Sequence, residues 1–185
     1  MEKFDPVVIE FLDHSNRIES VFSEDALEDA IKAWEYTCSL DKLEPSDVVD
    51  IHQMLMGRID PEIAGKYRSY AIRIGWEVKP FPGMEAFERK LKQICDVMND
   101  KTVGGDLEKL TKEMHIEYED LHCFGDGNGR SGRILYNWHR QRLGLPIHVI
   151  HEGDEQYEYY KWFEKDIPMG DFWEAISRPK KKKKS

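Results

Sequence analysis

The residues best suited to chemistry lie in one short run, residues 122–133, with the sequence HCFGDGNGRSGR. Glycines alternate there with Asp126, Asn128 and Arg130. Glycine at this density is unfavourable in regular structure, because each one costs about 1 kcal/mol relative to alanine inside a helix. We therefore predict a loop whose glycines let backbone N–H groups approach a ligand closely.

Apolar residues at helical spacing flank this loop on both sides, so it should join two helices. The second helix is predicted to begin near Asn128, where unpaired N–H groups and the positive end of the helix dipole favour an anion. Arg130 and Arg133 are three residues apart and can share one face of its first turn. Two guanidinium groups in this position indicate a polyphosphate ligand.

Two further side chains of the run suggest a reaction. Asp126 offers the hard oxygen ligand that Mg²⁺ prefers, since this ion is usually held by one or two carboxylates together with substrate phosphates. His122 ends the preceding helix, and an imidazole can accept a proton near neutral pH. The set of residues predicts transfer of a phosphate-containing group to a nucleophile that His122 deprotonates.

The same run matches the pattern H-x-F-x-[D/E]-G-N-G-R-x-x-R at every fixed position, and it therefore resembles the motif of the Fic family. The resemblance implies that His122 is the catalytic base, that Phe124 anchors the loop in the core, and that Asp126 holds Mg²⁺. Most members carry proline where this chain has Cys123. The related Doc kinases carry lysine in place of Gly129, so the glycine favours transfer of AMP over transfer of a phosphoryl group.

The resemblance also implies that ATP is the nucleotide substrate and that a protein hydroxyl is the acceptor. The implied nucleotide contacts come from the loop and from the helix that follows it: Gly125, Gly127, Asn128, Gly129, Arg130 and Arg133. One of two C-terminal tyrosines, Tyr159 or Tyr160, would flank the adenine, and core packing is the alternative for each of them.

An amphipathic helix is predicted at residues 6–21, with Ser15 and Glu19 one turn apart beside its apolar stripe. On its own, Glu19 is interpreted as a surface residue at the rim of the core. The segment also resembles the inhibitory helix of the family, [S/T]-x-x-x-E-[G/N], with Ser20 in place of the usual glycine or asparagine. This resemblance implies that Glu19 binds Arg133 and competes with the γ-phosphate of the nucleotide for the guanidinium.

A short hairpin is predicted at residues 70–78, where apolar and polar residues alternate up to Gly75. Its position resembles that of the flap that holds the target protein in this family by strand addition. Ile72, Arg73 and Ile74 would then dock the target. A hairpin with a purely structural role is the alternative.

Two other histidines require an interpretation. His52 lies on a helix that begins at Pro45, and a structural role is favoured for it. His115 lies seven residues before His122 and would share its helical face, so a two-histidine metal site has to be considered. The sequence offers no clear third ligand, and a structural role is favoured for His115 too.

The chain has 185 residues, of which 40% are hydrophobic, enough for one domain with a core of its own. We predict an all-α fold: a bundle of helices around the helix–loop–helix, with one small β-hairpin, as the Fic resemblance implies. Residues 1–178 would form this single domain, and the lysine-rich segment 179–185 would be a disordered tail.

Charge and composition limit the partners. The formal net charge is −9, and without the five lysines at 180–184 the remainder carries 22 Lys and Arg against 36 Asp and Glu, a net −14. An acidic body argues against nucleic acid as a partner. Three widely spaced cysteines form neither a disulfide framework nor a zinc pattern, and no apolar run approaches the ~20 residues of a membrane span. A cytoplasmic protein is expected.

The Fic resemblance therefore implies, as the leading prediction, a self-inhibited protein adenylyltransferase that uses ATP and Mg²⁺ to place AMP on a Ser, Thr or Tyr hydroxyl. Removal of AMP from the same target, with Glu19 positioning a water, remains an alternative. A catalytically silent nucleotide-binding adaptor is another, although pure binding would not require His122. An EF-hand reading of the loop fails at its fifth, sixth and twelfth positions: Arg130, Ser131 and Asn137. Whether the chain forms a homodimer stays open.

Overall fold

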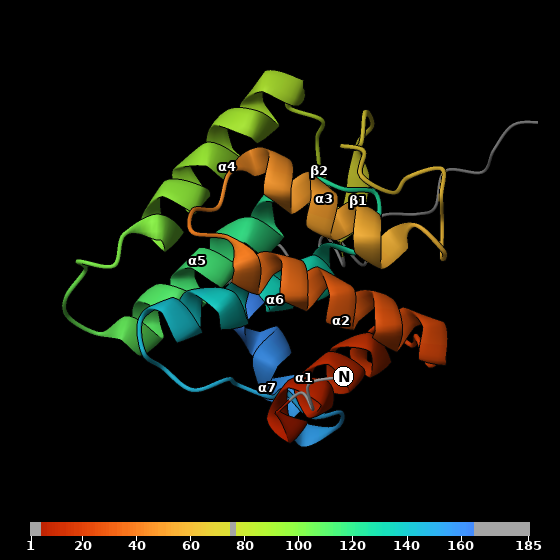
Figure 1. Cartoon of the computed structure of the whole chain (residues 1–185). Coiled ribbons are helices and arrows are strands. Elements are labelled where there is room, and N and C mark those ends of the chain that lie inside the picture. The colour runs from red at the N-terminus through yellow and green to blue at the C-terminus, as the bar shows by residue number, and fades with distance from the viewer. Residues whose placement is uncertain (1–4, 75–76, 165–185) are drawn as a thin grey trace, which may run out of the picture.

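The computed structural model of the protein describes residues 5–74 and 77–164. Within these residues the chain is mostly helical, as predicted, with one small antiparallel hairpin (Figure 1). The elements in order are α1 (Pro6–Ile18), α2 (Glu24–Ser39), α3 (Pro45–Met56), β1 (Ile72–Ile74), β2 (Glu77–Lys79), α4 (Met84–Asn99), α5 (Leu107–Leu121), α6 (Asn128–Arg142), α7 (Asp154–Tyr160) and the 3₁₀ turn η1 (Lys161–Phe163).

Helix α6 is the centre of the fold. It contacts α1, α2, α3 and α5, and twelve of its residues are buried although its sequence is rich in polar side chains. Figure 1 shows it enclosed by the other helices, with α1 and α7 at one end of the molecule and the hairpin away from them. The helix that carries both motif arginines is therefore also the helix around which the bundle packs.

The main core is formed by apolar faces of α1 to α6. Trp34 of α2 meets Phe11 of α1 edge to face, with ring centroids 5.4 Å apart. Phe124 of the motif loop is fully buried in the same core. The side chain of Phe124 thus anchors the loop in the core of the bundle. This is the role that the Fic resemblance implied for Phe124.

Short polar residues fix the helix starts that the sequence indicated. The hydroxyl of Ser23 accepts a hydrogen bond from the Ala26 N–H and caps α2. Glu44 precedes Pro45 at the start of α3, and its N–H donates to the Asp47 carboxylate at 2.7 Å. Such caps satisfy N–H groups that have no partner inside the helix.

Helix α1 ends at Ile18, three residues before the predicted end. Ser20 has a φ of +59°, and the N–H groups of Ser20 and Val21 donate to the carbonyls of Arg17 and Asn16. This is the hydrogen-bond pattern of a Schellman motif, in which a left-handed residue closes the helix. Glycine and asparagine adopt that conformation most readily, and serine adopts it here.

The hairpin is tied to the motif loop. β1 pairs with β2 antiparallel, with Arg73 opposite Val78. The buried Arg68 donates from Nε to the His122 carbonyl at 2.7 Å, and from Nη2 to the Pro80 carbonyl at 3.1 Å. One guanidinium therefore joins the loop to the chain that leaves the hairpin.

Two predicted segments extend past the last described residue, Glu164. The last part of the predicted domain, up to residue 178, and the lysine-rich segment 179–185 lie outside the described residues. Among the helices that are described, none combines the length and apolar character needed to cross a membrane.

Candidate active site

His122 lies at the junction of α5 and the motif loop. It caps α5 in a left-handed conformation, with φ +44° and ψ +58°. Its Nδ1 lies 3.2 Å from the Glu119 carbonyl, which can only accept, so Nδ1 carries the proton and Nε2 carries the lone pair. Burial lowers the pKa of this imidazole. Burial therefore favours the neutral form of His122, in which Nε2 can accept a proton.

The loop is supported from below by His52 of α3. The Gly65 N–H donates to Nδ1 of His52 at 3.0 Å, so Nε2 carries the proton and donates to the Asp126 carbonyl at 2.9 Å. The His52 ring also stacks on Phe124 with centroids 3.8 Å apart. His52 has the structural role that was favoured for it: it positions the loop.

Asn128 closes the loop on itself. Its Oδ1 accepts the Phe124 N–H at 3.1 Å, and its Nδ2 donates to the Phe124 carbonyl at 3.0 Å. Gly127 has a φ of +74°, and a Cβ there would meet Met56 and His52, so a side chain would disturb both the backbone and its support. The glycine and the asparagine fix the curvature of the turn that begins α6.

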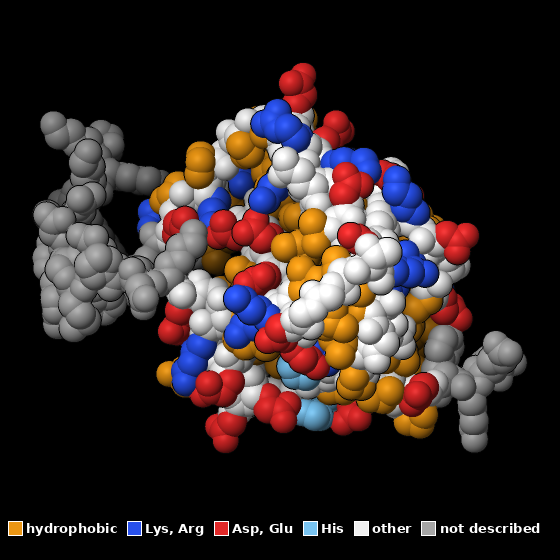
Figure 2. Space-filling view, turned by 90° about the vertical axis from the view of Figure 1, so that its left-hand side faces the viewer, with side chains coloured by type: hydrophobic (Ala, Val, Ile, Leu, Met, Phe, Trp, Pro, Cys, Tyr) orange, Lys and Arg blue, Asp and Glu red, His pale blue; other side chains and the backbone are white. Residues whose placement is uncertain are grey.

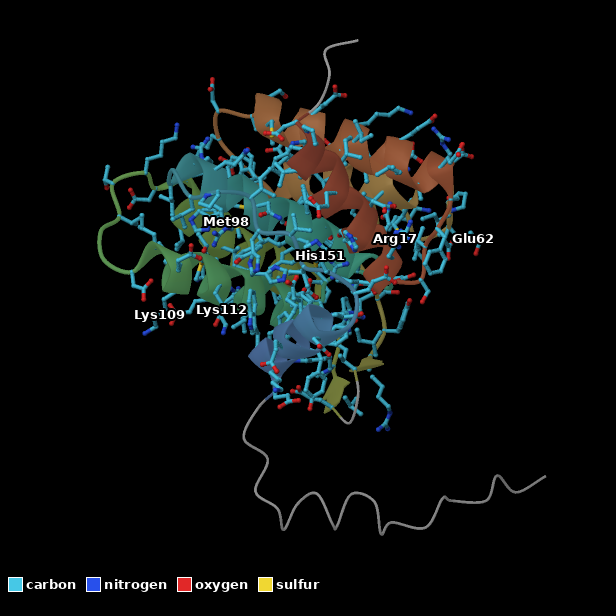
Figure 3. The ribbon with its side chains drawn as sticks, turned by 90° about the horizontal axis from the view of Figure 1, so that it is seen from below. Arg17, Glu62, Met98, Lys109, Lys112 and His151 are labelled. Carbon is cyan, nitrogen blue, oxygen red and sulfur yellow. The ribbon has the colours of Figure 1, made fainter. Side chains whose placement is uncertain are left out.

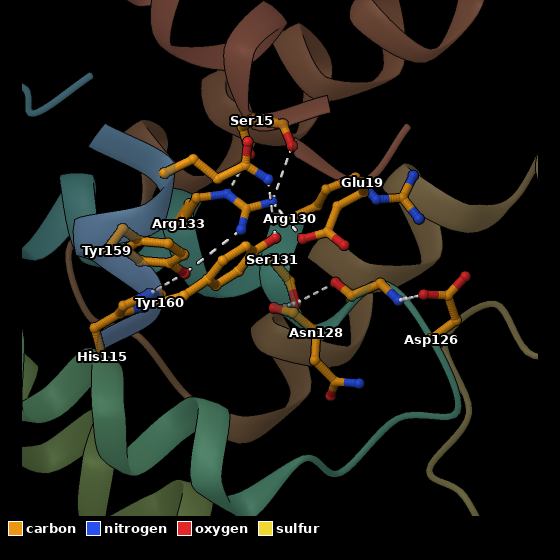
Figure 4. A network of polar contacts seen from close by, with 12 residues as sticks. Ser15, Glu19, His115, Asp126, Asn128, Arg130, Ser131, Arg133, Tyr159 and Tyr160 are labelled. Atoms are coloured by element: carbon orange, nitrogen blue, oxygen red, sulfur yellow. Dashed lines mark hydrogen bonds and ion pairs between the residues drawn. The ribbon is translucent and has the colours of Figure 1, made fainter. Parts of the chain in front are cut away.

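Arg133 of α6 is surrounded by acceptors from α1 and α7 (Figure 4). Its Nε donates to the Ser15 hydroxyl at 2.9 Å, and its Nη2 donates to the Ser15 carbonyl at 2.9 Å and to Glu19 Oε1 at 2.8 Å. Nη1 lies 3.5 Å from the Tyr159 hydroxyl. The pairing of Glu19 with Arg133 that the sequence implied is thus present, although the residues are 114 positions apart.

Only the arginine of this ion pair is buried. The Arg133 side chain is 3% exposed, whereas that of Glu19 is 34% exposed. Burial acts to lower the pKa of Arg133, and the oxygens of Tyr159, Glu19 and Glu119 outweigh it, so the pKa lies above its ordinary value. Gly129 allows the close approach, because a Cβ on it would lie 2.3 Å from Glu19 Oε1.

A cavity of about 700 Å³ opens above the loop. Its lining includes His122, most of the glycine loop, and the Glu19–Arg133 pair. Predicted site residues that line it are Glu19, Ile74, His122, Gly125, Asp126, Asn128, Gly129, Arg133, Tyr159 and Tyr160. The site residues are therefore gathered around one open space of a size suited to a small ligand.

The remaining predicted site residues are not part of that lining. Arg130 is buried, and its Nη2 lies 2.9 Å from the sulfur of Met56, while Nε and Nη1 have no hydrogen-bond partner within residues 5–74 and 77–164. Ser15 is buried against Arg133, and Gly127 packs against Met56 and His52, on the side of the loop that faces α3. On the hairpin, Ile74 reaches the cavity but Ile72 and Arg73 do not. Arg130 and Arg133 lie close enough for the charge of Arg133 to act on Arg130, but their hydrogen-bond partners differ: Arg130 contacts Met56 of α3 and Arg133 contacts Ser15 of α1.

The two tyrosines differ in their surroundings. Tyr159 is buried, and its hydroxyl lies 2.8 Å from Nε2 of His115. Burial lowers the pKa of His115 to about 3, so this histidine is neutral and its Nε2 can accept a hydrogen bond from the Tyr159 hydroxyl. His115 thus supports Tyr159, in keeping with the structural role favoured for it. Tyr160 is exposed at the cavity.

Glu119 is a cavity residue that the sequence analysis missed. It lies on α5, one turn before His122, and its Oε1 is buried with no hydrogen-bond partner in the described part of the chain. Burial raises the pKa of this carboxyl to about 7. Its position three residues before His122 could have indicated that it faces the same cavity, since residues at i and i+3 share a helical face.

Asp126 could hold a metal ion with help from a nucleotide. Its side chain is exposed at the cavity, and Oδ1 accepts the Gly127 N–H at 2.6 Å. A single exposed carboxylate beside a loop of backbone N–H groups fits Mg²⁺, which takes its other ligands from water and phosphates.

Comparison with known proteins is consistent with this geometry. The model of the Fic/DOC family matches residues 42–139. The chain is 33% identical over 129 residues to the protein adenylyltransferase fic-1 of Caenorhabditis elegans, covering 66% of this chain and 25% of that protein. It is 31% identical over 121 residues to the protein adenylyltransferase Fic of Nematostella vectensis, covering 63% and 27%.

Solved structures agree on the fold. Fic-1 of C. elegans superposes with a TM-score of 0.71 at 24% identity, covering 85% of this chain and 55% of that one. A Fic domain containing signaling protein from Bacteroides thetaiotaomicron superposes with a TM-score of 0.68 at 22% identity, covering 85% and 71%. The chain spans about a quarter of the length of the curated relatives described above.

Proposed function

Because the chain belongs to the Fic/DOC family, we propose that it transfers AMP from ATP to a hydroxyl group of a protein. The observation that carries this proposal is the position of His122, whose Nδ1 faces the Glu119 carbonyl and which lines the same cavity as the glycine loop. The names of the relatives, protein adenylyltransferases, support the same reaction. The acceptor would be a Ser, Thr or Tyr side chain of a partner protein.

In the proposed reaction the acceptor hydroxyl attacks the α-phosphorus of ATP. A bond forms between the acceptor oxygen and this phosphorus, the bond from it to the oxygen bridging to the β-phosphorus breaks, and pyrophosphate leaves. The acceptor proton moves to Nε2 of His122. General base catalysis of this kind contributes about 10²–10⁴-fold to a rate, and stabilisation of charge on the phosphates by backbone N–H groups adds to it.

Asp126 is the residue proposed to hold Mg²⁺ together with the nucleotide. A bound Mg²⁺ would neutralise charge on the phosphates. The Gly127 N–H fixes the carboxylate of Asp126, and the turn made by Asn128 presents it at the rim of the loop.

We further propose that the enzyme inhibits itself through α1. Ser15 and Glu19 occupy Nε and Nη2 of Arg133, and Tyr159 faces Nη1, so no pair of adjacent N–H groups remains for the γ-phosphate. Bidentate binding of phosphate by arginine needs such a pair. A nucleotide in the productive position would have to displace the carboxylate of Glu19.

The position of the label in ATP tests the reaction. We expect ATP labelled at the α-phosphorus to label the Glu19→Gly variant in an auto-modification assay, and ATP labelled at the γ-phosphorus to leave it unlabelled. Adding His122→Ala should abolish the labelling but leave nucleotide binding intact, because His122 acts on the acceptor. Transfer of the γ-label would identify a kinase, and labelling of the His122→Ala protein at the parent rate would remove the proposed base.

Removal of AMP is a second candidate, and the position of Glu19 favours it. One third of this side chain is exposed, and it lines the cavity, where a carboxylate can orient a water molecule. Release of AMP from a previously modified protein by the wild type, lost in Glu19→Gln, would support this activity. Equal release of AMP by the wild type and by Glu19→Gln would show that Glu19 has no part in this activity.

A further inference from the structure

A cluster of histidine and glutamate side chains lies outside the proposed active site. Glu10 and His14 are one turn apart on α1, and His151 lies in the segment that leads to α7. One potential ligand atom from each of these three residues falls within 4.8 Å of those of the other two. Figure 3 labels His151 between the red α1 and the blue α7, and Figure 2 shows histidine side chains at the surface beside acidic ones.

Glu155 orients the His151 ring. Its Oε2 lies 2.6 Å from Nδ1 of His151 and also accepts the His151 N–H at 3.0 Å. Nε2 of His151 is thereby directed toward α1, where it lies 2.9 Å from Oε1 of Glu10. A carboxylate behind one imidazole nitrogen, with the other nitrogen facing a group of ligands, is the usual environment of a metal-binding histidine.

His14 completes the group. Its ring meets that of His151 edge to face, with centroids 4.6 Å apart. Its Nδ1 is shielded from solvent and has no hydrogen-bond partner among the described residues. The Glu10–His151–Glu155 contacts are exposed and would stabilise the fold only slightly as ion pairs. These ion pairs also do not involve Nδ1 of His14.

We propose that Glu10, His14 and His151 form a site for a transition-metal dication of the Zn²⁺ class, with Glu155 holding the His151 ring. Two imidazoles and one carboxylate suit Zn²⁺, whereas Mg²⁺ and Ca²⁺ prefer oxygen ligands alone. Three protein ligands leave a fourth tetrahedral position for water. The spacing of Glu10 and His14 puts both ligands on one face of α1.

The ion would join the two elements that hold Arg133. Ser15 directly follows His14 on α1, Glu19 is the C-cap residue of that helix, and both contact Arg133. Tyr159, which faces Arg133 from α7, is one turn beyond Glu155. A metal ion bound by Glu10, His14 and His151 would link α1 to the segment before α7. It would therefore stabilise the arrangement in which Ser15, Glu19 and Tyr159 enclose Arg133. Any effect of this on nucleotide binding rests on the proposed function, but the binding of metal does not.

Metal titration of the full chain tests the site. We expect Co²⁺, used as a spectroscopic probe, to bind one ion per chain with the visible absorption of a tetrahedral site, and Zn²⁺ to displace it. His14→Gln and His151→Gln should each weaken binding at least tenfold. Asp13→Asn is the matched control, because it removes a carboxylate from the same helix without touching the cluster, and should bind as the wild type does.

Two results would overturn the site: wild-type affinity in both histidine variants, or loss of binding in His122→Ala with the cluster intact. Hydrogen exchange provides an independent readout of the bridge. Zn²⁺ should slow exchange of the α1 amides in the wild type and not in His14→Gln, with each variant compared with its own metal-free state. Unchanged exchange in metal-loaded wild type would contradict the link between α1 and α7. Neither measurement involves ATP, so failure here is separate from failure of the proposed enzyme activity.

Discussion

Replacing Glu19 by glycine should increase the affinity of the protein for ATP. The substitution removes the acceptor at 2.8 Å from Nη2 of Arg133 and leaves that N–H free for a γ-phosphate. A hydrogen bond to a charged group contributes about 1.5–3 kcal/mol. The lower part of this range applies, because the Glu19 side chain is 34% exposed. About 1.5–2 kcal/mol corresponds to a gain of roughly tenfold to thirtyfold in affinity.

Isothermal titration with a non-hydrolysable ATP analogue and Mg²⁺ measures this gain. Glu19→Gln should give a smaller increase, because it keeps an acceptor but removes the charge. Ser20→Gly is the matched control: it introduces a glycine next to Glu19, at a φ of +59° where glycine is favoured, and keeps the carboxylate. Equal affinities for the wild type and Glu19→Gly would refute the competition between the carboxylate and the nucleotide.

Three further predictions follow from buried groups around the cavity. The raised pKa of Glu119, about 7, means that its stabilising contribution is complete below pH 4.5 and is lost as the pH rises through 7. Urea unfolding of Glu119→Gln should therefore show a smaller loss of stability between pH 5 and pH 8 than the wild type, by up to about 3 kcal/mol; parallel pH profiles would contradict the burial of its charge. Tyr159→Phe removes the hydroxyl between His115 and Arg133 and should lower the free energy of unfolding by about 1–3 kcal/mol, and an unchanged denaturant midpoint would count against this contact. Burial lowers the pKa of His122, so the acid limb of the kcat/KM profile for AMP transfer should lie below pH 6.5; a limb above that value would mean that another group is the base.

The sequence predicted the main elements because their signals are local. Ser23 and Pro45 mark helix starts, and the glycines of residues 122–133 exclude regular structure there. The Glu19–Arg133 contact required a family resemblance, since no local pattern relates residues 114 positions apart. The end of α1 was misjudged because its apolar periodicity continues past Ser20, whereas the left-handed backbone at Ser20 stops the helix.

Properties set by burial were less accessible from the sequence. Glu119 looks like an ordinary polar residue of an amphipathic helix, and its raised pKa arises from packing against other elements. The contact of Arg130 with the sulfur of Met56 also depends on the packing of α3 against α6, which the sequence did not indicate. The cluster of Glu10, His14 and His151 is formed by segments from opposite ends of the described chain, so spacing within either segment could not indicate it.

Intact-protein mass spectrometry after incubation with ATP and Mg²⁺ tests the central claim most directly. The Glu19→Gly protein should gain the mass of one adenosine monophosphate or more, and the Glu19→Gly, His122→Ala protein should gain none. A double variant that is modified as fast as its parent, or a parent that gains only the mass of a phosphate, would contradict the assignment of the loop and of His122 to AMP transfer.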